Sequence, residues 1–166
     1  MPQLPGLLTL CADHTIDTET AALALRAGFL VSAGVGPGAV PLPGKAFRPK
    51  RRPVGGITLT RDLHLWQERA LPLARTAGLV ILDVPPSDPQ AAADALAFVE
   101  RIFGRYYTHQ RWHAMKVLAR RDSCTIKTPA SNGSEIERTI KWDNGLLFVQ
   151  QATAMERSTP AARAAP

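Results

Sequence analysis

The chain has 166 residues, of which 45% are apolar and 20% charged, so it can build a folded core and is not a disordered chain. No apolar run reaches the roughly 18 residues that a membrane span needs, and no cationic stretch precedes the first apolar run. The two cysteines, Cys11 and Cys124, are too few for a disulfide-rich scaffold or a four-cysteine zinc ribbon. The sequence therefore predicts a soluble cytoplasmic protein without a membrane partner.

The length favours one domain, which we expect to span residues 1–154. Within it, residues 34–56 hold five prolines and six glycines and predict an irregular loop. From residue 155 the sequence is rich in Ala, Arg, Ser and Pro, which predicts a flexible tail at 155–166.

In the first half of the chain, short apolar runs alternate with helical patterns. Strands are predicted at Leu7–Ala12, Phe29–Ala33 and Gly56–Thr60, because these runs are too short for helices. A helix from Asp17 to Ala27 has an acidic start and a glycine stop, and a second helix is predicted from Asp62 to Ala77.

The second half begins with the clearest strand, Leu79–Val84, whose continuous β-branched run is typical of a central strand. Ser87 or Asp88 then starts a helix to about Phe103, and a further helical stretch is predicted to about Arg120. Near the end, alternation over Ile136–Trp142 leads into Asp143-Asn144-Gly145, a strong hairpin signal, and Leu146–Gln151 returns.

These elements predict a β-α-β-β-α-β core, two further helices and a C-terminal β-hairpin. The fold class is α/β or α+β with a small mixed sheet, either ferredoxin-like or open α/β.

The positive charge is concentrated in two segments, 45–53 and 101–121, which together hold eleven of the twenty Lys and Arg residues and no acid. Such concentration attracts polyanions. If 101–120 is helical, its cations and histidines lie four residues apart along one face, with aromatic rings at the border that can stack on unpaired bases.

The leading hypothesis is therefore a non-enzymatic, cytoplasmic accessory protein that binds nucleic acid, with single-stranded DNA or RNA preferred. The predicted contact residues are Arg48, Lys50, Arg51, Arg52, Arg101, Arg105, Tyr107, His109, Arg111, Trp112, Lys116 and Arg120. This interpretation requires no cofactor and no metal.

An alternative interpretation is a metal-dependent nuclease or phosphohydrolase. Asp13 and Asp83 each follow an apolar strand, and with Asp17 or Glu19 they could hold Mg²⁺ for phosphoryl chemistry. The fragment Asp17-Thr18-Glu19-Thr20 resembles the first motif of DEDD-type 3′–5′ exonucleases, in which both acids bind metal. The third motif of that family has no counterpart in this sequence.

The strand Leu79–Val84 and the residues after it resemble the second nucleotide-site strand of partition-type ATPases, whose Asp lies near magnesium. The phosphate-binding glycine loop of those ATPases, which ends in Lys-Ser/Thr, is absent from the sequence.

A third interpretation is an interaction or inhibitor subunit of a larger assembly, whose basic surfaces meet an acidic protein partner. Leu146, Leu147 and Phe148 beside the hairpin turn are candidates for its interface.

Overall fold

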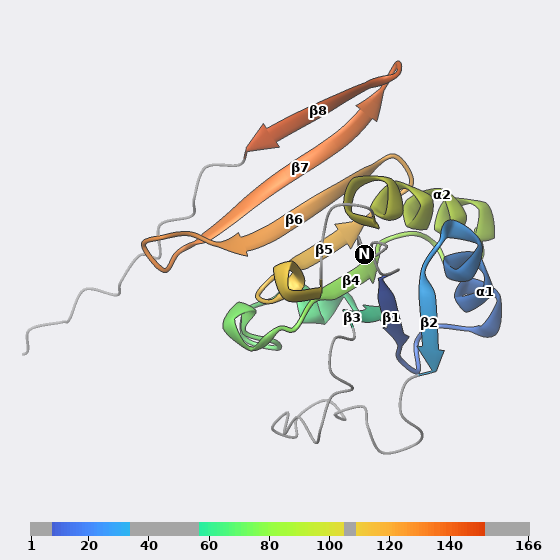
Figure 1. The fold of residues 1–166 in the computed structure, drawn as a ribbon, viewed down its shortest axis with the longest axis horizontal. Helices are drawn as coiled ribbons and strands as arrows, with labels where there is room; N and C mark the ends of the chain where they lie inside the picture. The colour runs from blue at the N-terminus through green and yellow to red at the C-terminus, as the bar shows by residue number, and fades with distance from the viewer. Residues whose placement is uncertain (1–7, 34–56, 105–108, 152–166) are drawn as a thin grey trace, which may run out of the picture.

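The computed structural model describes residues 8–33, 57–104 and 109–151. They form one eight-stranded sheet in the order β2-β1-β3-β4-β5-β6-β7-β8 (Figure 1). The strands are Thr9–Ala12 for β1, Leu30–Ala33 for β2, Ile57–Thr60 for β3, Leu79–Leu82 for β4, Lys116–Ala119 for β5, Ser123–Pro129 for β6, Glu135–Asp143 for β7 and Leu146–Gln151 for β8. In these described ranges, no helix is long and apolar enough to cross a membrane.

The sheet has a parallel half and an antiparallel half that meet at β5. Strands β2, β1, β3, β4 and β5 are parallel neighbours, whereas β5, β6, β7 and β8 pair antiparallel. The predicted mixed α/β fold with a C-terminal hairpin is therefore confirmed, and of the two arrangements considered the structure has the open α/β one.

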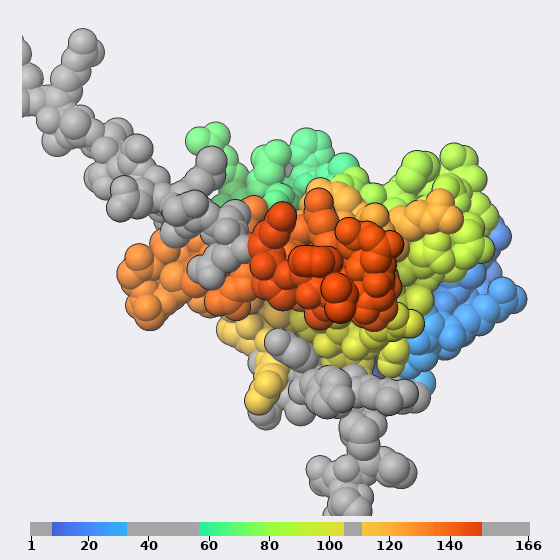
Figure 2. All heavy atoms as spheres, turned by 90° about the horizontal axis from the view of Figure 1, so that it is seen from above, coloured from blue at the N-terminus to red at the C-terminus, as the bar shows by residue number. Residues whose placement is uncertain are grey.

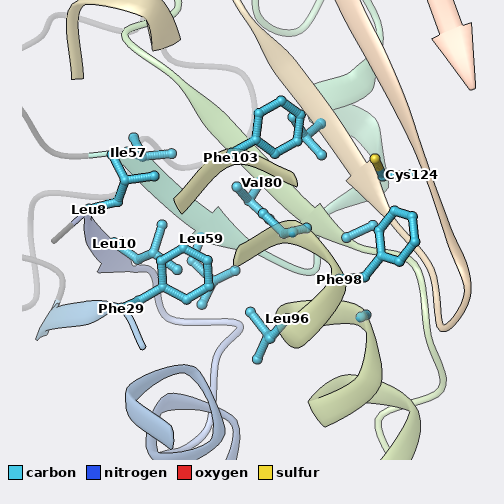
Figure 3. Close-up of a cluster of buried hydrophobic side chains, with 14 of the residues drawn as sticks. Leu8, Leu10, Phe29, Ile57, Leu59, Val80, Leu96, Phe98, Phe103 and Cys124 are labelled. Carbon is cyan, nitrogen blue, oxygen red and sulfur yellow. The ribbon is translucent and has the colours of Figure 1, made fainter. Parts of the chain in front are cut away.

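Two α-helices cover one face of the sheet, which we call the helix-side face (Figure 1). They are α1, Thr18–Ala27, and α2, Pro89–Val99; Asp17 caps the start of α1, and Asp88, one of the two candidates from the sequence, caps the start of α2. Both helices pack into one apolar cluster with β1, β3, β4 and β5. Figure 3 shows Leu96 and Phe98 of α2 within this cluster.

The predicted helix from Asp62 to Ala77 is wrong. The segment contains two short 3₁₀ helices, Leu63–Trp66 and Leu73–Arg75, which cover the opposite face of the sheet through a smaller cluster with β4 and β5. Pro72 has no amide hydrogen for a helical bond, and the ammonium group of Lys116 binds three carbonyls of the intervening turn.

The predicted helical stretch to Arg120 is also wrong. After α2 the chain makes a π-helical turn, Glu100–Gly104, and, beyond residues 105–108, a 3₁₀ turn, His109–Trp112. Residues 116–119 then form β5, with all four side chains buried. This short apolar run completes the centre of the sheet, and burial there outweighs the helical periodicity of the charged residues before it.

The C-terminal hairpin forms as the sequence predicts. Asn144 and Gly145 both have positive φ, 48° and 80°, as the turn between two strands of right-handed twist requires. The hairpin lies beyond α2 at one end of the sheet (Figure 1).

Candidate functional site

The carboxyl edge of the parallel strands has the geometry in which open α/β sheets bind ligands. After β1 the chain turns to the helix-side face as α1, whereas after the neighbouring strand β3 it turns to the opposite face. Neighbouring strands that release the chain to opposite faces create a crevice at the sheet edge. The polar side chains at this edge therefore decide what the crevice does.

Those side chains bond mainly to one another. Asp13 Oδ1 accepts hydrogen bonds from the backbone N–H of Thr15 at 2.8 Å and from its hydroxyl at 2.5 Å. The Thr15 hydroxyl also accepts from the backbone N–H of Arg61 at 2.8 Å and lies 3.2 Å from the hydroxyl of Thr60. The loops after β1 and β3 are thus joined by a closed hydrogen-bond network.

Arg61 extends this network to a third strand. Its Nη1 donates to the carbonyl of Val84 at 2.9 Å, and its Nη2 donates to the Thr20 hydroxyl at 3.2 Å. The pKa of Asp17 is lowered, chiefly by the hydrogen bond that it accepts from the Thr20 backbone N–H and, to a smaller extent, by Arg61. The guanidinium group joins β3 to the loop after β4 and to α1, so we assign it a structural role.

The four carboxylates of the predicted metal site do not converge. Asp13 and Asp83 follow β1 and β4, and β3 with Arg61 lies between those strands. Asp83 pairs with Arg120 at 2.8 Å, and Asp17 caps α1 while Glu19 is exposed in its first turn. Across the described ranges, no group of three or more His, Cys, Asp or Glu is placed to hold a metal ion.

The residues predicted to contact nucleic acid fall into three groups. Arg48, Lys50, Arg51, Arg52, Arg105 and Tyr107 lie outside the described residues, as does the side chain of His109. Arg101 and Arg111 are exposed. Trp112 and Lys116 are buried, and Arg120 is half-buried in its ion pair with Asp83. The continuous basic face predicted over 101–120 is therefore not formed, because the chain leaves the helical path within that segment.

Trp112 is a core residue rather than a stacking platform. Its side chain is completely buried and packs against Phe103, with ring centroids 5.1 Å apart and planes inclined at 58°. The prediction that it stacks on exposed bases is wrong, since the ring does not reach the surface.

Lys116 is also interior. Its Nζ donates to the carbonyls of Trp66 and Gln67, each at 3.4 Å, and to that of Leu71. Burial, with the neighbouring charge of Lys127, lowers its pKa from 10.5 to about 8. The prediction that it contacts phosphate is wrong, because backbone oxygens of its own fold hold its ammonium group.

A second lysine and two glutamates lie beside Lys116, and the sequence did not predict this cluster. Lys127 Nζ lies 4.4 Å from the centre of the Trp66 ring and within 3.5 Å and 3.3 Å of carboxylate oxygens of Glu135 and Glu137. Burial, together with a hydrogen bond to Glu68, raises the pKa of Glu135. Only the register of β6 against β7, which sequence patterns do not give, could have revealed this cluster.

A pocket of about 250 Å³ opens next to these glutamates. It is lined by Glu68, Leu73, Ala74, His113, Ala114, Pro129, Gly133, Ser134 and Glu135. Glu68 also accepts a hydrogen bond from the Leu73 backbone N–H at 2.9 Å, so this carboxylate helps to fix the pocket wall.

The burial of Lys116 predicts an unusual dependence of stability on pH. Between pH 8 and 10.5 the unfolded chain holds a proton on this lysine that the folded chain releases, so this contribution makes folding more favourable as pH rises. We expect the free energy of unfolding of the wild type, relative to Lys116→Met, to rise by about 3 kcal/mol across that window.

Urea denaturation of both proteins at several pH values measures this difference. Burial raises the pKa of Cys124 to about 12, which makes an opposing contribution to the pH dependence. Because Cys124 is present in both proteins, this contribution cancels in the comparison. A difference that stays constant from pH 7.5 to 10.5 would show that Lys116 titrates normally.

The β7–β8 hairpin keeps its acidic side chains on one face of the sheet. Ile140 packs into the helix-side cluster, so Arg138 and Trp142, each two residues away, lie on the same face. The three acids of β7, Glu135, Glu137 and Asp143, lie on the opposite face. Among the β7 and β8 residues described, the helix-side face thus carries a cation and no acid.

An arginine from outside the hairpin adds to this cationic face. The guanidinium carbon of Arg101 lies 4.9 Å from the centre of the Trp142 ring, which remains 40% exposed. The neighbouring Glu100 points elsewhere, because its side chain lies within about 4 Å of the position of a Cβ on Gly28, at the end of α1. The signal for this face in the sequence is the alternation over Ile136–Trp142, which predicts the strand but not its function.

Comparison with protein-family models, with curated proteins and with solved structures finds no match to this chain.

Proposed function

We propose that this chain is a cytoplasmic accessory protein that binds nucleic acid on the helix-side face of the β7–β8 hairpin. The observation that carries the proposal is the exposed Trp142, which lies against Arg101 and on the same face as Arg138, a face from which the carboxylates of β7 are excluded. A polyanion gains from two cations there without meeting the carboxylates of β7.

The aromatic ring favours single strands. Stacking on a protein ring requires a base whose own face is free, as in single-stranded DNA or RNA. Arg101 already stacks on Trp142, so a base can join the stack or replace the guanidinium, which then turns to a phosphate. Trp142 supplies sequence-tolerant stacking, and the arginines supply backbone contacts.

Buried Lys116 and ion-paired Arg120 aside, the other basic residues keep the role that the sequence predicts for them. Exposed Arg111 adds positive charge. The segment 45–53 and Arg105 with Tyr107 are expected to add phosphate and base contacts, although they lie outside the described residues. The proposal therefore rests on the hairpin face alone.

The test is binding of labelled single- and double-stranded oligonucleotides, followed by fluorescence anisotropy across a salt series. We expect salt-sensitive binding, and we expect Trp142→Ala to weaken it by about 5- to 100-fold, as the loss of one stacked base predicts. Arg101→Ala should weaken binding and reduce its salt dependence. Arg75→Ala, which removes an exposed cation of the 3₁₀ segment on the opposite face, serves as the matched control and should change little.

The same samples, run on a gel with and without magnesium, distinguish the alternatives. Intact oligonucleotide supports the proposal, whereas magnesium-dependent shortening would favour a nuclease. Equal affinity of Trp142→Ala and the wild type would remove the hairpin face from the proposal.

An interaction subunit is the second candidate function. It is favoured by the exposed aliphatic side chains Leu147 and Val149, which lie beside the cations on the same face and suit a protein surface better than a base. Such a subunit would bind an acidic protein partner through Arg101 and Arg138. Absence of oligonucleotide binding at low salt would favour this function.

A further inference from the structure

Strand β8 is the outer strand of the antiparallel half and forms an edge of the sheet in the described part of the chain. In the described sheet β8 pairs with β7 alone. A strand at the end of a sheet presents backbone N–H and C=O groups that can pair with another strand.

The register of the hairpin shows which backbone groups point outward. Asp143 and Leu146 flank a two-residue loop and form a hydrogen-bonded pair, so the next pair, Trp142 and Leu147, is not hydrogen-bonded. The N–H of Trp142 confirms this alternation, because it donates to the carbonyl of Asp122 at 3.0 Å, away from β8. The backbone groups of Leu147, Val149 and Gln151 therefore face this edge.

The sequence of this strand lacks the charged residues and prolines that commonly prevent pairing at an edge. Residues 146–151 include no charged residue and no proline. Four consecutive side chains are apolar and exposed, from 45% at Leu147 to 63% at Leu146. The space-filling view in Figure 2 shows β8 on the surface that faces the viewer. An uncharged, apolar edge of this kind is expected to be covered.

We propose that a second copy of this chain covers the edge, with the two β8 strands antiparallel about a twofold axis perpendicular to the sheet. Such an axis keeps the helix-side faces of both copies on one side, so each residue must pair with one that points to the same face. Odd-numbered residues therefore pair with odd-numbered residues, and even-numbered with even-numbered. The backbone N–H and C=O groups of Leu147 in one copy can then bond to those of Val149 in the other.

One such register places the three central side chains, Leu147, Phe148 and Val149, opposite apolar side chains and leaves Leu146 opposite Gln150. With Phe148 on the axis, it faces its own copy, and Leu147 faces Val149 on the helix-side face. The Phe148 pair is then a non-hydrogen-bonded pair, in which side chains are closest, and aromatic pairs there stabilise a sheet. A shift by one residue along each strand toward the C-terminus would place Phe148 against Gln150. The opposite shift would place Phe148 against Leu146, but it would shorten the paired segment, because the turn residue Gly145 would lie opposite Val149.

The charges of the molecule permit this arrangement. Since β8 has no charged residue, two copies meet without like charges in direct contact. On the face of the hairpin that carries Phe148, the nearest cation is Lys141 of β7. It would lie three strand spacings, or about 14 Å, from the same residue in the second copy. That separation exceeds the screening length of about 8 Å at physiological salt. The strand is thus complementary to itself, which favours a second copy over a charged partner strand.

Charge substitutions at Phe148 test the proposal, with sedimentation velocity across a broad concentration series as the readout. The wild type should shift with concentration from the 18.0 kDa chain mass to twice that mass. Phe148→Lys and Phe148→Glu should each remain at the single-chain mass, because each places two like charges directly opposite each other. An equimolar mixture of the two variants should form a heterodimer.

Leu25→Lys is the matched control, because Leu25 on α1 is about as exposed as Phe148, 54% against 49%, and lies outside β8. It should dimerise as the wild type does, and far-UV circular dichroism checks that every variant is folded. A wild type that stays at the single-chain mass, single variants that still dimerise, or a mixture that fails to associate would each overturn the proposal. No nucleic acid is present, so these results are independent of the proposed binding function.

Discussion

Replacing Trp112 with alanine is expected to lower the free energy of unfolding by about 3–5 kcal/mol, as for other buried aromatic residues. The side chain is fully buried and packs against Phe103, at the junction of the segment after α2 with the sheet. Alanine would leave a cavity at this junction, which rigid packing around β4 and β5 cannot fill. Chemical denaturation followed by circular dichroism measures the loss.

Trp112→Phe separates packing from hydrogen bonding. The indole Nε1 has no hydrogen-bond acceptor among the described residues, so phenylalanine removes no bond and should cost much less than alanine. Oligonucleotide binding by folded Trp112→Phe should equal that of the wild type. A selective loss of binding with unchanged stability would instead restore the exposed stacking role that the sequence first predicted.

Gly78→Ala is expected to be the next most damaging change, at about 2–4 kcal/mol. Gly78 precedes β4 with a φ of 123°, which side-chain-bearing residues rarely adopt. A Cβ there would lie 3.0 Å from the Cβ of Trp112 and 3.1 Å from Cγ1 of Ile57, so two core residues would have to move. Thermal and urea denaturation should both report the loss.

Gly133→Ala provides the matched control, because it separates backbone strain from steric crowding. Gly133 also has a positive φ, 80°, but a Cβ there would meet nothing within 4 Å. Its substitution should cost about 1 kcal/mol, from backbone conformation alone. Equal losses at the two glycines would show that the close approach of Trp112 and Ile57 is unimportant.

The sequence predicts elements well where local and tertiary preferences agree. The run Leu79–Val84 is β-branched and apolar and becomes buried strand β4, and Asp17 and Asp88 cap the helices as their positions suggest. The Asn144-Gly145 turn fixes the hairpin register, because few residues other than these adopt its backbone conformation readily.

Predictions failed where distant contacts overrode local periodicity. The spacing of cations over 101–120 suits a helix, but residues 116–119 gain more by pairing with β4 and β6 in the centre of the sheet. The ammonium group of Lys116 then binds the turn at 66–71 and helps to prevent the helix predicted there. No pattern within either segment reports this contact, which spans about fifty residues.

For the same reason, only part of the candidate site could be predicted from the sequence. Arg101 is a charged residue in a basic segment and was identified directly, whereas its partner Trp142 becomes its neighbour only through packing of β7 beyond α2. The placement of the acids on one face of the hairpin depends on which face Ile140 buries, and that face is decided by the tertiary fold.

The parallel and antiparallel halves of the sheet place different demands on biosynthesis. Strands β5–β8 are joined in sequence order by short connections, so they can form quickly once made. In contrast, β1 lies between β2 and β3, and β4 gains its second neighbour only when residue 119 has left the ribosome. A chain that stalls or is cut before that residue would carry β4 with an unpaired, fully apolar edge. We therefore expect such fragments to depend on chaperones or to aggregate rather than to fold part of the sheet.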